Sequence, residues 1–447
     1  MGELKNWCWM HYEKYIMIEY LQCKKEGLIV DDLKPLCEYV SNNYGKIDVK
    51  QLGEDLERQL HSCKKDENFK YAEPSTYDEI IQELKPSTFI KKELSNDEIK
   101  DHIKGAWIGR LAGCLLGKPL EGWRSHNIIK MLKETNNYPL SRYISKKDFS
   151  KELIDSLWID VNSFWIDNLK DASFNDDDTT YTVLALKNVL YWGRNFTSYN
   201  VLETWLRFLP MVITCTAERI AFRNAASGLL PPFTATHQNP YREYIGAQIR
   251  GDFYGYININ NPKAAAKMAF NDASISHTKN GIYGEMFVSS LNAIAPCYDN
   301  METIILKALE QIPYNSRFHE EIMLVINDYK NNVSEEDNRK NIQKRYNENI
   351  ELEWGYVLSN AAIVAHGLLY GKNDFALSIG YAIMCGFDTD CNGATVGSVI
   401  GMFLGAKKIP PYWYESFKSK LYTSVEGYNL VDIETLVNET LKCLEQK

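Results

Sequence analysis

Three groups of acidic residues along the chain have the composition and spacing of a metal site. Residues 176–178 are three consecutive aspartates at the start of an apolar helical run, and Asp388 and Asp390 stand at the start of another. Glu121 lies just after a third run, which spans residues 105–117. A single aspartate at a helix start is ordinarily an N-cap, but adjacent carboxylates repel one another unless a cation holds them. Carboxylate oxygens favour Mg²⁺ or Mn²⁺ over Zn²⁺, which prefers histidine or cysteine.

The number of these carboxylates predicts more than one ion. Six carboxylates at three places exceed the need of a single ion, so we expect two ions that share a bridging carboxylate. A pair of ions can hold the neighbouring hydroxyls of a sugar and polarise a water for attack. The acidic residues therefore indicate hydrolysis at an activated carbon or phosphorus centre.

Two segments with glycine at every fourth position must position these acids. A spacing of four places the glycines on nearly one face of an α-helix. Each glycine inside a helix costs roughly 1 kcal/mol relative to alanine, and close backbone approach between two packed helices would offset that cost. We expect the two helices to pack antiparallel, which brings Glu121 to Asp388 and Asp390. The glycines are Gly105, Gly109, Gly113 and Gly117 in the first segment and Gly393, Gly397, Gly401 and Gly405 in the second.

The remaining pattern predicts an all-α fold, a compact multi-helix bundle with a helical N-terminal extension, because few alternating strand patterns occur. Residues 1–95 are expected to form that extension and a linker, and residues 96–447 the catalytic domain. Ser95 and Glu98 would cap the first glycine-rich helix. This division predicts an extension that packs on the main body or on a partner.

Two further expectations concern the stretch after the first glycine-rich helix. The polar composition from Glu121 to about residue 150 predicts a loop region. An apolar helix over residues 179–191 should follow the three aspartates. The acids would then stand at the beginning of a helix.

Composition narrows the classes of function. The chain has 447 residues and a net charge of −9, which argues against non-specific binding to nucleic acid or to an anionic membrane. Its ten cysteines include no C-x-x-C pair, a usage typical of a reduced compartment. The N-terminus is too charged for a signal peptide. We expect a cytoplasmic protein.

Several motifs that suggest other functions do not fit. The segment from Gly113 to Lys118 has three residues between its glycines, where a phosphate loop needs four. The second glycine-rich run ends at Lys407, too short for a membrane span. A magnesium-dependent isoprenoid synthase is a weaker alternative, because its acidic motif would need an acid where Thr180 and Tyr181 stand. The sequence contains no His-Asp dipeptide, which excludes a phosphohydrolase of the HD type.

The motifs GRLAGCLLGKPLE, DDDTT, SHTKNGIYG and GFDTDCNGATVGSVIG together resemble the ADP-ribosylglycohydrolase family over about residues 98–410. The resemblance implies an all-α fold with two Mg²⁺ ions, for which Mn²⁺ could substitute. It also implies cleavage of the glycosidic bond between ADP-ribose and an acceptor, in a substrate such as an ADP-ribosylated protein.

The resemblance further implies a role for individual residues. One ion would be held by residues 176–178 and Asp390, and the other by Asp388, Asp390, Cys391 and Glu121. Glu121 would contact the ribose hydroxyls or act as acid and base. Carried over by position, the metal ligands are Asp176, Asp177, Asp178, Asp388, Asp390 and Cys391, the catalytic residues are Glu121, Asp177 and Asp178, and the substrate-binding residues are Gln248, Arg250, Asp252, Phe253, His277, Asn280, Gly281 and Tyr283.

Two positions depart from the family pattern. Asp176 and Cys391 stand where the family usually has threonine. A thiol is a poor ligand for Mg²⁺, so Cys391 leaves its position to water or Asn392, or favours a softer ion. Arg250 is expected to offset diphosphate charge. The Cys391 departure keeps a second function open, that of a non-catalytic protein that binds ADP-ribose or a nucleotide.

Overall fold

The structure, a computed structural model, describes residues 11–446 and is almost wholly helical. The only strands in these residues are β1 (Lys420–Tyr422) and β2 (Leu430–Asp432), which pair as a short antiparallel hairpin. The prediction of an all-α fold is confirmed. Among the described residues, no helix is long and apolar enough to cross a membrane.

Two glycine-rich helices form the centre of the molecule. They are α5 (Asn96–Gly117) and α21 (Thr389–Leu404), and residues 105–117 of α5 are all buried. A Cβ atom added to Gly109 would lie 1.9 Å from the carbonyl oxygen of Gly397, and one added to Gly397 would lie 2.1 Å from that of Gly109. The expected antiparallel packing is therefore confirmed, and only glycine permits it. Ser95 and Glu98 form the predicted capping box.

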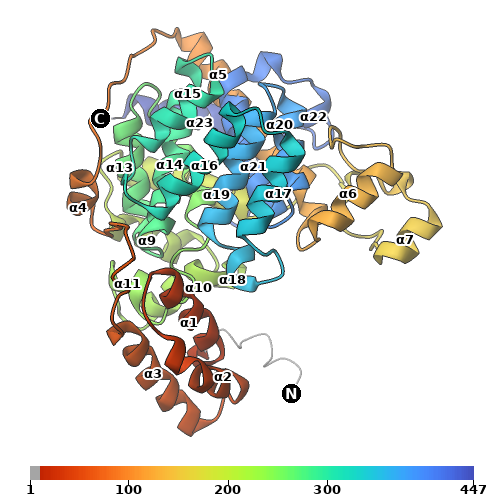
Figure 1. Cartoon of the computed structure of the whole chain (residues 1–447). Helices are drawn as coiled ribbons and strands as arrows, with labels where there is room; N and C mark the ends of the chain where they lie inside the picture. Colours follow the sequence, from red (N-terminus) through yellow and green to blue (C-terminus); the bar gives the residue numbers. More distant parts are fainter. Residues whose placement is uncertain (1–10, 447) are drawn as a thin grey trace.

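The other helices of the body pack around this pair and enclose one large hydrophobic core. Figure 1 shows α14, α16, α19 and α20 gathered beside α21. The helix α8 begins at Asp177, as the sequence predicts to within two residues. The surrounding helices are α8 (Asp177–Trp192), α9 (Ser198–Phe208), α10 (Thr216–Ala226), α11 (Phe233–Thr236), α12 (Asp252–Tyr256), α13 (Pro262–Ala273), α14 (Asn280–Ile294), α15 (Met301–Leu309), α16 (Arg317–Lys330), α17 (Glu335–Arg345), α18 (Glu351–Trp354), α19 (Val357–Tyr370), α20 (Phe375–Met384), α22 (Tyr412–Glu415) and α23 (Ile433–Glu445).

The N-terminal extension forms a small lobe below the body in Figure 1. It contains α1 (Ile16–Lys25), α2 (Lys34–Asn42) and α3 (Ile47–Ser62), which share a hydrophobic core of their own. A strap, residues 64–95, then runs along the side of the body to α5 and carries the short helix α4 (Tyr77–Gln82). The lobe is thus a separate helical unit docked on the body.

The stretch after Glu121 is not the continuous loop that its polar composition predicts. It contains α6 (Ser125–Glu134), and α7 (Lys151–Leu157) follows. The helix α6 forms because Ile128, Met131 and Leu132, at helical spacing, are fully buried while its polar residues face outward. Figure 1 shows α6 and α7 as an arm at one side of the body.

Candidate metal centre and active site

The acidic residues meet where the N-termini of α8 and α21 approach the C-terminal end of α5. Asp176 is the N-cap of α8, and its Oδ1 accepts a hydrogen bond from the Asp178 N–H at 3.0 Å. Asp388 precedes the first residue of α21. The hydroxyl of Thr389 donates to the Gly117 carbonyl at 3.0 Å and ties the two central helices together. The positive ends of two helix dipoles therefore face the carboxylates and favour negative charge there.

The ligand atoms of these residues form overlapping groups. The atoms within each group lie within 4.8 Å of one another, a spacing that one metal ion can bridge. Glu121 meets Asp388 and Asp390, as the antiparallel packing predicts. Cys114 of α5 adds a thiol beside α8. The groups are Asp178, Asp390 and Cys391; Glu121, Asp388 and Asp390; and Cys114, Asp176 and Asp178.

A lysine that sequence analysis missed lies among these carboxylates. The Lys118 Nζ is 2.7 Å from Glu121 Oε2, 2.8 Å from Asp176 Oδ2 and 2.9 Å from Asp390 Oδ2. In the sequence, Lys118 directly follows Gly117, the last glycine of the first segment. It stands three residues before Glu121, which is the i,i+3 spacing of a helical ion pair. Lys118 is therefore part of the site.

Sequence analysis also missed Arg110, which contacts the acids of the site from the buried interior of α5. Its guanidinium is fully buried and forms ion pairs with Asp178 Oδ1 at 3.0 Å and Asp252 Oδ2 at 2.8 Å. It also donates to the Thr395 hydroxyl at 3.0 Å, which lies on α21. Arg110 thus fixes the position of Asp178 between α5 and α21. Asp252 forms an ion pair with Arg110 and so has a structural role.

Part of the negative charge at the centre has no partner. Asp178 Oδ2 and Asp390 Oδ1 are buried and accept no hydrogen bond. Burial and the neighbouring carboxylates raise the pKa of Asp177 and of Asp388 well above the ordinary value. Unpaired buried carboxylate oxygens are costly unless a cation binds them. The residues present therefore fit a divalent cation.

Glu121 differs from the other acids because its side chain is partly open to solvent. The Glu121 side chain is 40% exposed. Burial and then the charge of Asp390 raise its pKa, while Lys118 opposes the shift. A carboxyl at the edge of the site with a raised pKa suits proton transfer.

The residues expected to bind substrate lie in the interior. Arg250 is 1 % exposed and forms ion pairs with Glu218 at 2.6 Å and Glu285 at 3.5 Å. It is also paired with Asp272. Its charge therefore neutralises carboxylates of the protein, and the expected contact with a diphosphate stays a prediction. Gln248 and Phe253 are likewise fully buried.

The segment that begins at His277 is covered by the strap. The Tyr283 hydroxyl donates to the Pro74 carbonyl, and the Lys279 N–H donates to Ser75 Oγ at 3.1 Å. The Asn280 side chain donates to Glu243 at 2.7 Å. Gly281 lies against the carbonyl of Arg242, and His277 contacts Ser276. That these residues line a substrate groove also stays a prediction.

A cavity of about 540 Å³ lies between the lobe and the body. Lys14 and Tyr15 line it from the lobe, and Cys215 and Arg219 line it from the start of α10. The cavity therefore lies at the contact between the lobe and the start of α10.

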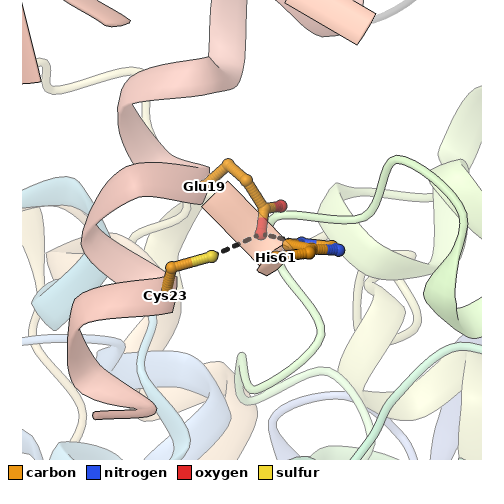
Figure 2. A group of neighbouring side chains, drawn as sticks. All are labelled: Glu19, Cys23 and His61. Carbon is orange, nitrogen blue, oxygen red and sulfur yellow. Dashed lines mark hydrogen bonds and ion pairs between the residues drawn. The ribbon is translucent and has the colours of Figure 1, made fainter. Parts of the chain in front are cut away.

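A second group with metal-ligand chemistry lies in the lobe. Figure 2 shows Glu19, Cys23 and His61, with Glu19 Oε1 at 3.2 Å from the Cys23 sulfur and 2.8 Å from His61 Nε2. The same oxygen is 2.7 Å from the Arg242 guanidinium of the body. Arg242 already supplies the positive charge here, so the group joins the lobe to the body.

Comparison with known proteins identifies the family. Residues 95–442 match the model of a family described as ADP-ribosylglycohydrolase. A solved structure described as an ADP-ribosylglycohydrolase-related protein complex is similar, with a TM-score of 0.51 and 18% identity over 78% of this chain and 99% of that chain. No curated protein matches the sequence. On the family match, the chain belongs to the ADP-ribosylglycohydrolase family.

Proposed function

We propose that this protein is a metal-dependent hydrolase that cleaves the glycosidic bond between ADP-ribose, or a related ribosyl group, and an acceptor. The observation that carries the proposal is the pair of bare, buried carboxylate oxygens on Asp178 and Asp390 in a chain of this family. Asp178, Asp390 and Cys391 also have ligand atoms within 4.8 Å of one another, a spacing that one metal ion can bridge. Reversal of ADP-ribosylation is the reaction this site supports best.

Metal binding would use the acids that the resemblance implies. Asp176, Asp177, Asp178, Asp388 and Asp390 supply oxygens, and Cys391 stands where a further ligand is expected. A divalent ion held there orients hydroxyls and water and acts as a Lewis acid. Mg²⁺ and Mn²⁺ fit the oxygen donors.

The side chains of the protein supply the remaining chemistry. Cleavage of a ribosyl bond builds positive charge on the anomeric carbon and ring oxygen, and the carboxylates of Asp177 and Asp178 stabilise that charge. Glu121 is poised to hold or release a proton at the site edge, an assistance typically worth ~10²–10⁴-fold in rate. Lys118 and Arg110 keep the acids in place.

The test is hydrolysis of ADP-ribosyl-arginine, ADP-ribosyl-serine and small ADP-ribose conjugates by the full chain with Mg²⁺ or Mn²⁺. Asp177→Asn is expected to lose at least ~10²-fold in turnover while it keeps the fold. Asp374→Asn is the matched control, because Asp374 also starts a helix, α20, and caps it through the Leu377 N–H at 2.8 Å. Near-normal turnover in Asp177→Asn would contradict the proposal.

A second candidate is a non-catalytic protein that binds ADP-ribose or a nucleotide. Cys391 favours it, because a thiol within the ligand group of Asp178 and Asp390 departs from an all-oxygen site. Binding of ADP-ribose without hydrolysis of any conjugate would select this function. Conversion of Cys391→Thr should then create or raise turnover.

A further inference from the structure

The ammonium of Lys118 occupies a place that has the surroundings of a cation site. Its Nζ is 2.7–2.9 Å from one carboxylate oxygen each of Glu121, Asp176 and Asp390. These carboxylates come from the turn after α5, the cap of α8 and the first turn of α21. The ammonium thus joins the same three elements that a metal ion would join.

The backbone holds Lys118 in this place. Lys118 is the first residue of a 3₁₀ turn, Lys118–Leu120, which continues directly from α5. The preceding Gly117 packs on α21 so closely that an added Cβ would lie 2.2 Å from the Thr389 carbonyl oxygen. The Lys118 side chain is only 16% exposed. An ammonium buried among carboxylates at this depth belongs to the site.

The buried carboxylate oxygens that have no partner are not the oxygens that contact Lys118. Asp390 gives Oδ2 to Lys118, whereas its Oδ1 is buried without a partner. Asp178 Oδ2 is likewise bare, and Asp178, Asp390 and Cys391 have ligand atoms within 4.8 Å of one another. The centre therefore has an outer position, which Lys118 fills, and an inner position, which still needs a cation.

We propose that the Lys118 ammonium is the resident cation of the outer position and that the centre binds one divalent ion, at the inner position. This inference rests on the metal dependence in the proposed function and departs from the two ions that the family resemblance implies. A second divalent ion would have to displace the ammonium, or lie within a few ångströms of it against strong repulsion. Lys118 thus acts as a positioning residue that sets the metal count.

The test is a titration of the metal-free full chain with Mn²⁺, in which electron paramagnetic resonance measures free Mn²⁺. Wild type should bind one ion. Lys118→Met keeps the length of the side chain but removes the charge, so it should bind two ions. Its first ion should bind about tenfold tighter or more, because a positive charge has left the site.

Two controls define the cause. Lys118→Arg keeps the charge and should bind one ion. Lys104→Met, on α5, removes a lysine that pairs with Glu434 at the surface and should also bind one ion. Thermal unfolding shows whether each variant is folded. If Lys118→Met does not fold, the number of ions that wild type binds tests the inference by itself.

Two bound ions in wild type, or an unchanged single ion in Lys118→Met, would overturn the inference. Hydrolysis of ADP-ribosyl substrates, measured on the same samples, separates it from the proposed function. Turnover with two ions in wild type would leave the function standing and remove the role of Lys118. One ion in wild type, two ions in Lys118→Met and no turnover would support the role of Lys118 and contradict the proposed function. No bound ion in wild type would contradict both.

Discussion

The metal centre and the interface that the lobe and the strap form with the body both bury acidic side chains, but the surroundings of these side chains differ. At the interface, the Arg317 guanidinium donates to Glu73 at 2.6 Å and 2.9 Å, one bond to each carboxylate oxygen, and to Glu243 at 2.9 Å. At the centre, Asp178 and Asp390 each keep a bare oxygen. The paired carboxylates of Glu73 and Glu243 join parts of the fold, whereas the bare oxygens of Asp178 and Asp390 belong to a group of potential metal ligands.

The electrostatics of the two regions follow the same division. Burial alone would raise the pKa of Glu26 in the lobe, but Arg242 and Lys279 lower it well below the ordinary value. Burial raises the pKa of Asp178 well above the ordinary value, and Arg110 offsets only part of the effect. The ion pairs of Glu26 therefore stabilise its charged form, whereas the centre destabilises the charged form of Asp178 until a cation binds.

The largest expected effect is at the interface. Arg317→Met would leave Glu73 and Glu243 buried without their shared cation, and we expect a loss of about 3–5 kcal/mol in the free energy of unfolding. Urea denaturation measures it. Arg207→Met is the control, because its pair with Glu203 is exposed and should change stability by less than about 1 kcal/mol. Equal losses in the two variants would show that the buried ion pairs of Arg317 stabilise the fold no more than an exposed pair does.

The metal centre should respond in the opposite direction. Asp388→Asn removes one charge from a site where burial and Asp390 raise the pKa of Asp388. In EDTA at pH 8 the variant should be more stable than wild type, because it removes a charge whose burial the site disfavours. With Mn²⁺ it should lose most of the stabilisation that wild type gains by binding. A variant that is less stable than wild type in EDTA would show that Asp388 is structural.

A smaller effect sharpens the description of the interface. Burial and the charge of Glu19 raise the pKa of Glu57 to about 7, although its carboxylate accepts the Gln238 N–H at 3.1 Å. Because its folded pKa exceeds its unfolded value, Glu57 favours the folded state at low pH, and this contribution is lost as the pH rises through about 7. Between pH 5 and 8, wild type should lose about 2 kcal/mol relative to Glu57→Gln.

Urea denaturation of both proteins at several pH values measures this difference. The comparison cancels the titration of groups that the two proteins share. Parallel stability curves would show that Glu57 is not held in an environment that favours its neutral form.

The central helices could be predicted from the sequence because their signal is local. Glycine at every fourth position fixes which faces of α5 and α21 can touch, and the antiparallel arrangement follows from the acids at their ends. The helix α6 was missed because its polar residues outnumber the few apolar ones that bury. Regular spacing was a better guide than average polarity.

The candidate site could be predicted only in part. The sequence showed the acids, but not which oxygens lie bare, since that depends on neighbours far along the chain. Lys118 and Arg110 escaped notice for this reason, because Asp176 and Asp390, which contact Lys118, and Asp178, which contacts Arg110, come from distant segments. The sequence likewise could not show the carboxylate partners of Arg250, Glu218 and Asp272, and its expected contact with a diphosphate stays a prediction.

The most direct test of the central claim is a calorimetric titration of ADP-ribose into the full chain, first with Mn²⁺ and then with EDTA, beside Asp390→Ala. We expect ADP-ribose to bind wild type in the presence of Mn²⁺, and we expect this binding to be lost in EDTA and in Asp390→Ala. Absence of binding under every condition, or binding that neither EDTA nor Asp390→Ala affects, would contradict a metal-dependent ADP-ribose site at the bare carboxylates.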